Sequence, residues 1–411
     1  MLASLALNSL NSRRRSVLLT FFSLLISIAV LISVEHIRVQ AKESFNRTIS
    51  GVDLIVGAPS GQLNLLLYSV FRMGNPTNNI KFDSFQALRD HKQVNWAIPI
   101  SLGDSHRGYR VLGTDDSYFA HYKFGKKQSL QFSEGQPFHA LFDVVLGADV
   151  AKQLNYQIGD KIVIAHGIGA TSFSKHDKTP FAISGILKPT GTPVDKTVHV
   201  SLKAIEAIHL SPAKQARLQS GDASVDLMPK SVTSVLVGLN SKLATFKLQR
   251  ELGHYQSDRL MAILPGVAMT ELWQMMASIE NILRVISVLV LISALFGLST
   301  MLLASMEQRK SEFAVLRVLG ASAGVIFTLI LTEAFILMTF AFISAAGFVF
   351  LVTALLSDWL AANYGLFISQ SLVTWDLIVM FGLVAIATFI TSLIPALDAY
   401  KRAIHSTLSA K

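Results

Sequence analysis

Long apolar stretches divide this chain into segments of two kinds. Four stretches carry almost no charge, and they cover residues 17–34, 285–306, 323–357 and 377–397. The hydrocarbon core of a bilayer is about 30 Å thick, and a helix needs about 20 mostly apolar residues to cross it. The pattern therefore predicts four membrane-spanning helices.

The first apolar stretch has two interpretations. Arg13, Arg14 and Arg15 precede it, as basic residues precede a cleavable signal peptide. However, the apolar run is long for a signal peptide, and the only small-x-small cleavage candidate nearby is the weak sequence at residues 39–41. We therefore favour an uncleaved membrane anchor over a signal peptide.

The short loops predict the orientation of the spans. The loop between the second and third stretches carries Arg309, Lys310 and Arg317, whereas residues 358–376 carry no Lys or Arg. Cytoplasmic loops are enriched in Lys and Arg. We therefore expect the former loop and both chain termini in the cytoplasm, and residues 38–275 outside.

Residues 38–275 alternate strand patterns with helical patterns, which predicts an α+β or α/β domain. Expected strands cover residues 53–56, 96–100, 109–113, 143–146, 161–165, 181–187, 197–201 and 233–238, and expected helices cover 84–91, 148–154, 202–209 and 241–252. The flanks, 45–120 and 230–275, offer strand–helix–strand units, while 128–228 is richer in short strands and Gly/Pro turns. This difference predicts two lobes, with the middle part inserted into the other.

Composition narrows the possible functions. Mean hydropathy is +0.47 and 15% of residues are charged, against roughly 25% in soluble domains. The net charge of +9 is spread without a basic stripe interleaved with aromatic residues, so we expect no nucleic-acid partner. With no cysteine, disulfides and thiolate metal sites are excluded. No GxxxxGK[ST] phosphate loop occurs, so this chain does not hydrolyse ATP by that route.

Scattered ionisable residues do not indicate a catalytic, cofactor or metal site. The histidines between residues 91 and 254 are best interpreted as solvated loop residues, including His166 and His176, which flank a polar loop with Asp177. Asp115 and Asp116 fit a turn better than acid–base chemistry. Glu333 lies inside the third apolar stretch. We expect it to serve structure or coupling, by reaching the interface or pairing with a neighbouring subunit, rather than ion transport.

The loop after the second apolar stretch has the pattern of a short amphipathic helix. Phe313, Leu316 and Leu319 recur at three-residue spacing, while polar residues crowd the start of the segment. Gly320 is placed to end this helix and Ser322 to cap the next. By physics alone, a helix lying on lipid is an equally good interpretation.

This segment closely resembles the cytoplasmic loop of the MacB/FtsX-type (type VII) ABC permeases. The matching residues are Glu307, Arg309, Phe313, Ala314, Leu316, Arg317, Gly320, Ala321, Ser322 and, early in the next span, Glu333. Glu312 is offset by one residue from the usual second glutamate, which leaves the helix undisturbed. Residues 145–151 with 159–161, and 394–396 with 400–402, also look like this family.

The resemblance implies a non-catalytic permease subunit that moves its outer domain when a partner hydrolyses ATP, a mode called mechanotransmission. The expected parts are a cytoplasmic N-terminus 1–15, spans 16–37, 280–306, 323–357 and 377–397, a periplasmic domain 38–275, a coupling helix 307–322, a periplasmic loop 358–376 and a cytoplasmic tail 398–411. The periplasmic domain would divide into Porter-like flanks and a Sabre-like insertion, and the protein would lie in the bacterial inner membrane. Coupling would involve Glu307, Arg309, Phe313, Leu316, Arg317 and Gly320.

Partners and cofactors also follow from the resemblance. Two copies of an ABC ATPase subunit would bind ATP and Mg, with no cofactor in this chain. A second permease, identical or paralogous, and membrane lipid would complete the complex, and some family members add a periplasmic adaptor or binding protein. Family members serve efflux, lipoprotein extraction or control of cell-wall hydrolases.

Two other functions remain as alternatives. A membrane-tethered sensor or receptor for a periplasmic ligand fits the large outer domain, although the cytoplasmic segments are too short for an output module. A secondary transporter would need inverted repeats or broken helices with several intramembrane polar groups. Four spans with one carboxylate do not fit that pattern well.

Overall fold

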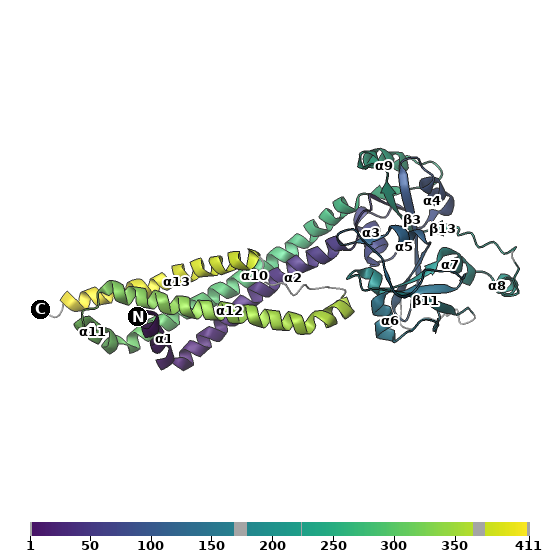
Figure 1. Cartoon of the computed structure of the whole chain (residues 1–411). Coiled ribbons are helices and arrows are strands. Elements are labelled where there is room, and N and C mark those ends of the chain that lie inside the picture. Colours follow the sequence, from purple (N-terminus) through teal and green to yellow (C-terminus); the bar gives the residue numbers. More distant parts are fainter. Residues whose placement is uncertain (1, 168–178, 223, 365–374, 409–411) are drawn as a thin grey trace. The chain divides into compact units, whose positions relative to one another are not determined.

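The computed structural model describes residues 2–167, 179–222, 224–364 and 375–408, and these form two compact units (Figure 1). The unit here called the helical unit comprises Met1–Ala41, Ala277–Trp359 and Ile368–Lys411. The sheet unit comprises Lys42–Met276 and Leu360–Phe367.

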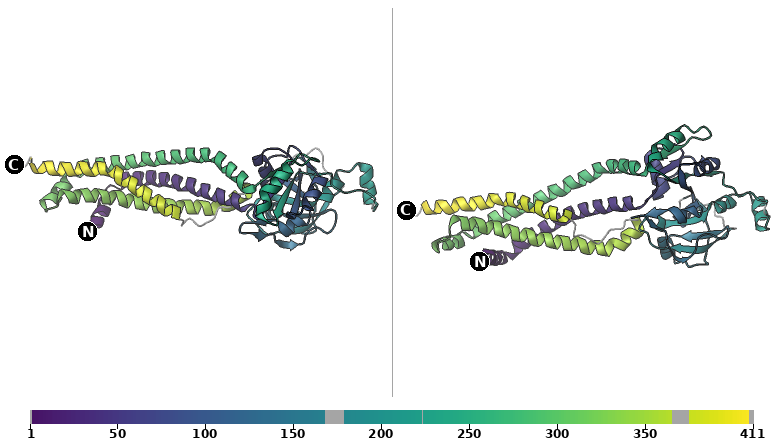
Figure 2. Two further views of the ribbon diagram at one scale, coloured as in Figure 1. Left: turned by 90° about the horizontal axis from the view of Figure 1, so that it is seen from above. Right: turned by 45° about the horizontal axis from the view of Figure 1, so that its top comes forward.

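The helical unit contains four long helices that run side by side (Figures 1 and 2). Its elements are α1 (Leu2–Ser12), α2 (Arg14–Arg47), α10 (Pro265–Gln308), α11 (Lys310–Val318), α12 (Ala323–Tyr364) and α13 (Trp375–Leu408). Residues 42–47 of α2, 265–276 of α10 and 360–364 of α12 belong to the sheet unit. The helices α2, α10, α12 and α13 are long and apolar enough to cross a membrane, which confirms the four predicted spans. The hydrophobic pattern did not reveal α1, which lies within the predicted N-terminal segment.

The long helices are apolar on every side, as expected for helices that face both a protein core and lipid. Their inward residues form one core, which includes Leu24, Ile28, Leu295, Leu298, Met338, Ala345 and Val384. Outward residues such as Leu19, Ile343 and Leu383 are more than half exposed. The Ser299 hydroxyl of α10 also donates a hydrogen bond to the Thr391 carbonyl of α13 at 2.8 Å, a type of contact that joins membrane helices.

The sheet unit is built on a mixed sheet with the strand order β15-β1-β14-β3-β4-β12-β8-β11-β7, to which β10 and β9 add at β3 and β11. The strands are β1 (Leu54–Gly57), β2 (Ile80–Lys81), β3 (Val94–His106), β4 (Tyr109–Thr114), β5 (Lys123–Phe124), β6 (Gln128–Ser129), β7 (Phe132–Gly135), β8 (Asp143–Leu146), β9 (Lys161–Ile162), β10 (Ala165–His166), β11 (Phe181–Leu187), β12 (Thr197–Ser201), β13 (Ser231–Val232), β14 (Ser234–Leu239) and β15 (Met261–Ile263). The helices are α3 (Gln62–Leu66), the π-helix η1 (Leu67–Phe71), α4 (Phe82–Arg89), α5 (Ser117–His121), α6 (Ala148–Leu154), the 3₁₀ turn η2 (Pro193–Lys196), α7 (Leu202–Ile208), α8 (Pro212–Gln219), the 3₁₀ turn η3 (Lys242–Ala244) and α9 (Thr245–Gly253).

One long strand joins the two halves of this sheet. The first half of β3 pairs antiparallel with β14, from Val94 to Ile100, and its second half pairs antiparallel with β4. Beyond β4, the pairings of β4 with β12 and of β8 with β11 are parallel. Because β4 lies in the predicted flank 45–120 and β12 in the predicted insertion, the sheet runs continuously across the expected lobe boundary. The division into Porter-like and Sabre-like parts stays a prediction.

Helices cover the sheet in three apolar clusters. Side chains of α4 and α9 pack with β1 and β14, for example Phe85 and Leu248 with Val235. Those of α6 and α7 pack with β8, β11 and β12. A third cluster gathers residues of α3, η1 and α5, including Leu65 and Tyr118. The mixture of strands and covering helices confirms the predicted α+β class.

Most predicted elements of the sheet unit are present, and the differences are local. The strands predicted at 143–146, 181–187 and 197–201 and the helix at 148–154 match the observed bounds. The strand predicted at 161–165 is two short strands, β9 and β10. The helix predicted at 241–252 begins as a 3₁₀ turn, in which the Ala244 N–H donates to the Ser241 carbonyl at 3.0 Å. The Ser241 hydroxyl caps this turn by accepting a hydrogen bond from the Leu243 backbone N–H.

The interpretation of the histidines as solvated loop residues is wrong for His106 and His199, which are both buried. Burial lowers the pKa of His106, whose ring nitrogens lie 2.7 Å from the Val163 carbonyl oxygen and 2.9 Å from the Tyr156 hydroxyl. Burial lowers the pKa of His199 to about 3. Both imidazoles therefore belong to the packed interior as neutral groups. His176 and Asp177 lie outside the described residues.

Gly147 connects β8 to α6 where two backbone segments approach each other closely. An added Cβ there would lie 2.2 Å from the Val194 carbonyl oxygen and 2.4 Å from that of Asp195. Both atoms belong to backbone, so a small side chain cannot be accommodated without moving η2.

We predict that Gly147→Ala destabilises the sheet unit by about 1–3 kcal/mol, the usual cost of overpacking. Hydrogen exchange of the amides of β8 and α6 in the full-length protein in detergent measures this change. Gly103→Ala is the matched control, since nothing lies within 4 Å of its added Cβ. Equal protection in the two variants would contradict the role assigned to Gly147.

Candidate functional site

The helix α11 is a separate short helix held between two long ones. At its start, the Arg309 backbone N–H still donates to the Ser305 and Met306 carbonyls of α10, and Phe313 N–H donates to the Arg309 carbonyl. At its end, Gly320 N–H donates to the Arg317 carbonyl and Ala321 N–H to the Leu316 carbonyl. This is a Schellman ending, which needs the left-handed backbone that Gly320 adopts at φ +95°. The predicted helix stop at Gly320 is therefore confirmed.

The side chains of α11 divide into an inner and an outer set. Phe313 and Leu316 are partly buried, and the ring of Phe313 packs against the core of the helical unit. Val315, Val318 and Leu319 are exposed, by 59%, 88% and 77%. Phe313 and Leu316, two residues of the predicted apolar face, therefore point inward. The third, Leu319, is exposed together with Val315 and Val318, and these three form the exposed apolar surface of the segment.

Glu333 and Arg309 form a buried ion pair, although 24 positions separate them in the sequence. An Arg309 guanidinium nitrogen, Nη1, donates to Glu333 Oε1 at 2.8 Å, and the two side chains are only 7% and 1% exposed. Arg309 Nε also donates to Glu312 at 2.7 Å, and its guanidinium lies 4.8 Å from the centre of the Phe313 ring. The structure thus joins two predicted site residues, Arg309 and Glu333, directly.

The helix α1 and the residue that follows it, Arg13, supply the remaining partners of Glu333. Arg13 Nη2 donates to Glu333 Oε2 at 3.0 Å, and the Ser9 hydroxyl donates to Glu333 Oε1 at 2.6 Å. We call the set Ser9, Arg13, Arg309 and Glu333 the ion cluster. The partners of Glu333 lie in its own chain, whereas the sequence had suggested the interface or a neighbouring subunit.

Sequence reasoning missed Ser9 and Arg13 as site residues. A signal was present, since Ala6, Ser9 and Leu10 of α1 and the following Arg13 recur at helical spacing. All four side chains are buried or partly buried against the bundle. Eleven residues with several serines and asparagines form a weak helix pattern on their own, so the face was not evident before packing was known.

The other predicted coupling residues lie nearer the surface. Glu307, at the end of α10, pairs with Arg402 of α13, and both side chains are about half exposed. Arg402 also pairs with Asp398, one turn earlier, at 2.8 Å. Arg317 is partly buried. The Glu307–Arg402 pair connects α10 with α13, whereas the Asp398–Arg402 pair lies within α13. Both contribute little to stability, because water screens exposed charges.

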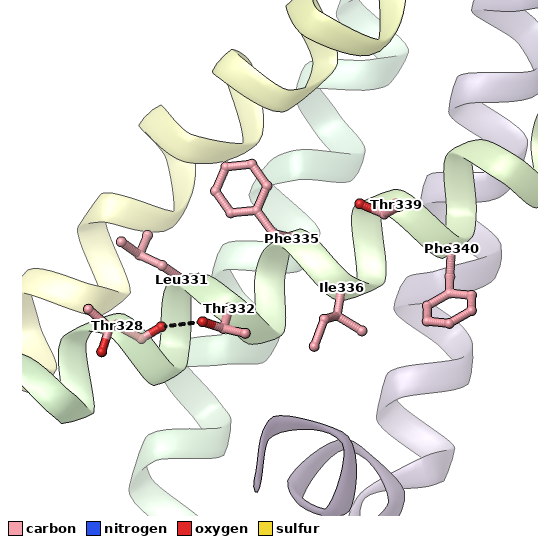
Figure 3. A pocket seen from close by; sticks show the side chains of 7 residues that line it. All are labelled: Thr328, Leu331, Thr332, Phe335, Ile336, Thr339 and Phe340. Atoms are coloured by element: carbon pink, nitrogen blue, oxygen red, sulfur yellow. Dashed lines mark hydrogen bonds between the residues drawn. The ribbon is translucent and has the colours of Figure 1, made fainter. Parts of the chain in front are cut away.

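A shallow groove of about 450 Å³ runs along α12 on the side shown in Figure 3. It is lined by Thr328, Leu331, Thr332, Phe335, Ile336, Thr339 and Phe340. The Thr332 hydroxyl donates to the Thr328 carbonyl at 2.7 Å, and the Thr328 hydroxyl donates to the Gly324 carbonyl at 3.0 Å. Because the helix itself uses these hydroxyls, the groove presents mainly apolar groups and does not resemble an ion path.

We predict that Glu333→Gln destabilises the helical unit by about 3–5 kcal/mol, because two buried guanidinium groups lose their carboxylate. Thermal unfolding of the full-length protein in detergent measures the change. Arg402→Gln is the control, and removal of that exposed pair should cost about 0–1 kcal/mol. The double variant Arg309→Gln/Glu333→Gln should lose less than the sum of the single variants; strict additivity would show that the two side chains do not interact.

Comparison with known proteins places the chain in a family. Residues 17–255 match the family model of the MacB-like periplasmic core domain, and residues 284–404 match that of the FtsX-like permease C-terminal region. Among solved structures, the chain is similar to the periplasmic region of MacB from Actinobacillus actinomycetemcomitans, with 12% identity over 55% of this chain and 94% of that chain and a TM-score of 0.35. No match was found among the curated proteins. The chain therefore belongs to the MacB/FtsX-like permease family, whose members are membrane subunits of ABC transporters.

Proposed function

We propose that this permease transmits the work of a separate ATPase subunit to its periplasmic domain, for export, extraction or regulation of cargo on the periplasmic side. The proposal rests on the structure of α11. This short helix exposes an apolar surface, and the buried ion pair of Arg309 with Glu333 joins its start to α12. The lack of a phosphate loop in this chain supports an ATPase on another polypeptide.

The exposed surface of α11 suits a protein partner. Val315, Val318 and Leu319 are three large apolar side chains on one short helix, and neighbouring apolar side chains of this kind often mark an interface. The loop that contains α11 is basic, which supports a cytoplasmic location where ATP is available. We infer that the ATPase subunit receives these residues in an apolar groove, while Phe313 and Leu316 attach α11 to the permease.

Two connections carry a displacement of α11 into the spans. The backbone of Arg309 is bonded to the last turn of α10, and its side chain is bonded to Glu333 of α12. The helix α10 has 44 residues and hence a length of about 66 Å. It begins at Pro265, with Leu264 alone between it and β15. A continuous helix transmits an axial push better than a flexible linker does, so α10 is the natural lever to the periplasmic domain.

The complete complex would hold further chains. We propose two ATPase subunits that bind ATP and Mg, and a second permease that is identical or paralogous. Both termini of this chain would lie in the cytoplasm of a bacterium, and the protein would lie in the inner membrane. Cargo need not pass through this chain, because the described part of the helical unit buries a single carboxylate, Glu333, within its spans, and arginines already pair with it.

We predict that Val318→Asp lowers stimulation of the ATPase by this permease about 30-fold or more, because a charge in an apolar interface costs about 2 kcal/mol or more. The measurement is ATP hydrolysis by the partner ATPase reconstituted with the full-length permease. Val318→Ile, which stays apolar, should retain stimulation. Val318 tests the contact better than Phe313, because Phe313→Asp would also disturb Arg309.

The proposal fails if Val318→Asp assembles with the ATPase and stimulates it as the native chain does. If the native permease binds a signalling protein from the same membranes and no ATPase, the sensor hypothesis replaces it.

A further inference from the structure

The ion cluster contains more positive than negative charge. Arg13 and Arg309 both donate to Glu333. The second acid nearby, Glu312, is 57% exposed and contacts Arg309 alone among these arginines. The Arg13 side chain is nine-tenths buried, and its Nη1 atom has no hydrogen-bond partner among the described residues. An unpaired nitrogen of a buried guanidinium is costly, so an anion beside Arg13 would stabilise the cluster.

Two further cations adjoin Arg13 at the bend between α1 and α2. Arg14 and Arg15 are both exposed, and neither forms an ion pair within the described part of the chain. We call Arg13, Arg14 and Arg15 the basic elbow. Three consecutive cations with little acidic compensation attract an anion from outside the chain.

Apolar side chains flank the basic elbow on both of its arms. Leu5 and Leu7 of α1 are 40% and 49% exposed, and Leu18, Leu19 and Phe22 of α2 are 50%, 75% and 54% exposed. Guanidinium groups between exposed apolar residues at the end of a membrane span are the arrangement found where a protein meets lipid headgroups.

We propose that the basic elbow binds the phosphate of an anionic phospholipid in the cytoplasmic leaflet, with its acyl chains along the first turns of α2. A phospholipid supplies both the negative charge that the arginines lack and the apolar chains that cover Leu19 and Phe22. A carboxylate of a soluble partner would supply only the charge. Since Arg13 shares Glu333 with Arg309, the bound lipid also stabilises the attachment of α11.

This inference rests on the proposed function only for the cytoplasmic placement of the elbow. Its test uses neither ATP nor an ATPase, so it can fail while the coupling proposal stands, and the reverse also holds.

The full-length protein in neutral detergent is titrated with the anionic lipid dioleoylphosphatidylglycerol or with the zwitterionic lipid dioleoylphosphatidylcholine. Native mass spectrometry measures the number of lipid molecules bound to each protein. The native chain should retain more dioleoylphosphatidylglycerol than dioleoylphosphatidylcholine. Arg14→Gln/Arg15→Gln should bind it about 25-fold more weakly, because each arginine near a lipid surface is worth about fivefold in affinity. Both residues are exposed, so these variants should fold.

Two control variants separate charge from position. Arg14→Lys/Arg15→Lys should bind close to the native level, and Lys126→Gln/Lys127→Gln, which removes two exposed cations from the sheet unit, should bind as the native chain does. Equal retention of the two lipids by the native chain would overturn the proposal, as would native binding by the Arg14→Gln/Arg15→Gln variant. Competition by inorganic phosphate at concentrations equal to the lipid would instead indicate a site for a soluble anion.

Discussion

A carboxylate buried among membrane helices can remain charged only where cations and hydrogen-bond donors surround it. Glu333 is 1% exposed and receives donors from Arg309, Arg13 and Ser9. These donors come from three places in the sequence, namely α1, the start of α11 and the connection between α1 and α2. The need to satisfy one carboxylate therefore brings the N-terminal segment and the start of α11 together at α12.

This constraint explains why α11 is held as part of the helical unit and is not an independent surface helix, which the proposed coupling role requires. A helix of nine residues is too short to be stable alone in water. Its inward residue Phe313 packs on the core and beneath Arg309, and its final turn is set by the backbone of Gly320. The apolar surface around Val318 stays exposed. The contacts of Phe313 and Arg309 that fix the orientation of α11 therefore also determine which of its side chains are accessible.

In the periplasmic domain, the long strand β3 has a comparable role. Its two halves pair with different neighbours, β14 and β4, so that one continuous strand belongs to both parts of the sheet. The strand β15, which precedes α10 in the sequence, is connected to β3 through β1 and β14. Because hydrogen-bonded strands resist sliding past one another, this sheet is suited to the rigid-body movement that we propose.

The sequence alone determined the features that depend on local pattern. Apolar runs of sufficient length identified the four spans, and alternation and turn residues identified strands such as β8 and β11. The spacing of Phe313, Leu316 and Leu319 identified α11, and Gly320 identified its end. Only the tertiary structure decided which side chains meet. Arg309 and Arg13 approach Glu333 from positions 24 and 320 residues away, and no periodicity encodes such a distance. Burial of His199 and the exposure of Val318 likewise depend on neighbouring elements, because a helix or strand pattern shows that a face is apolar but not what covers it.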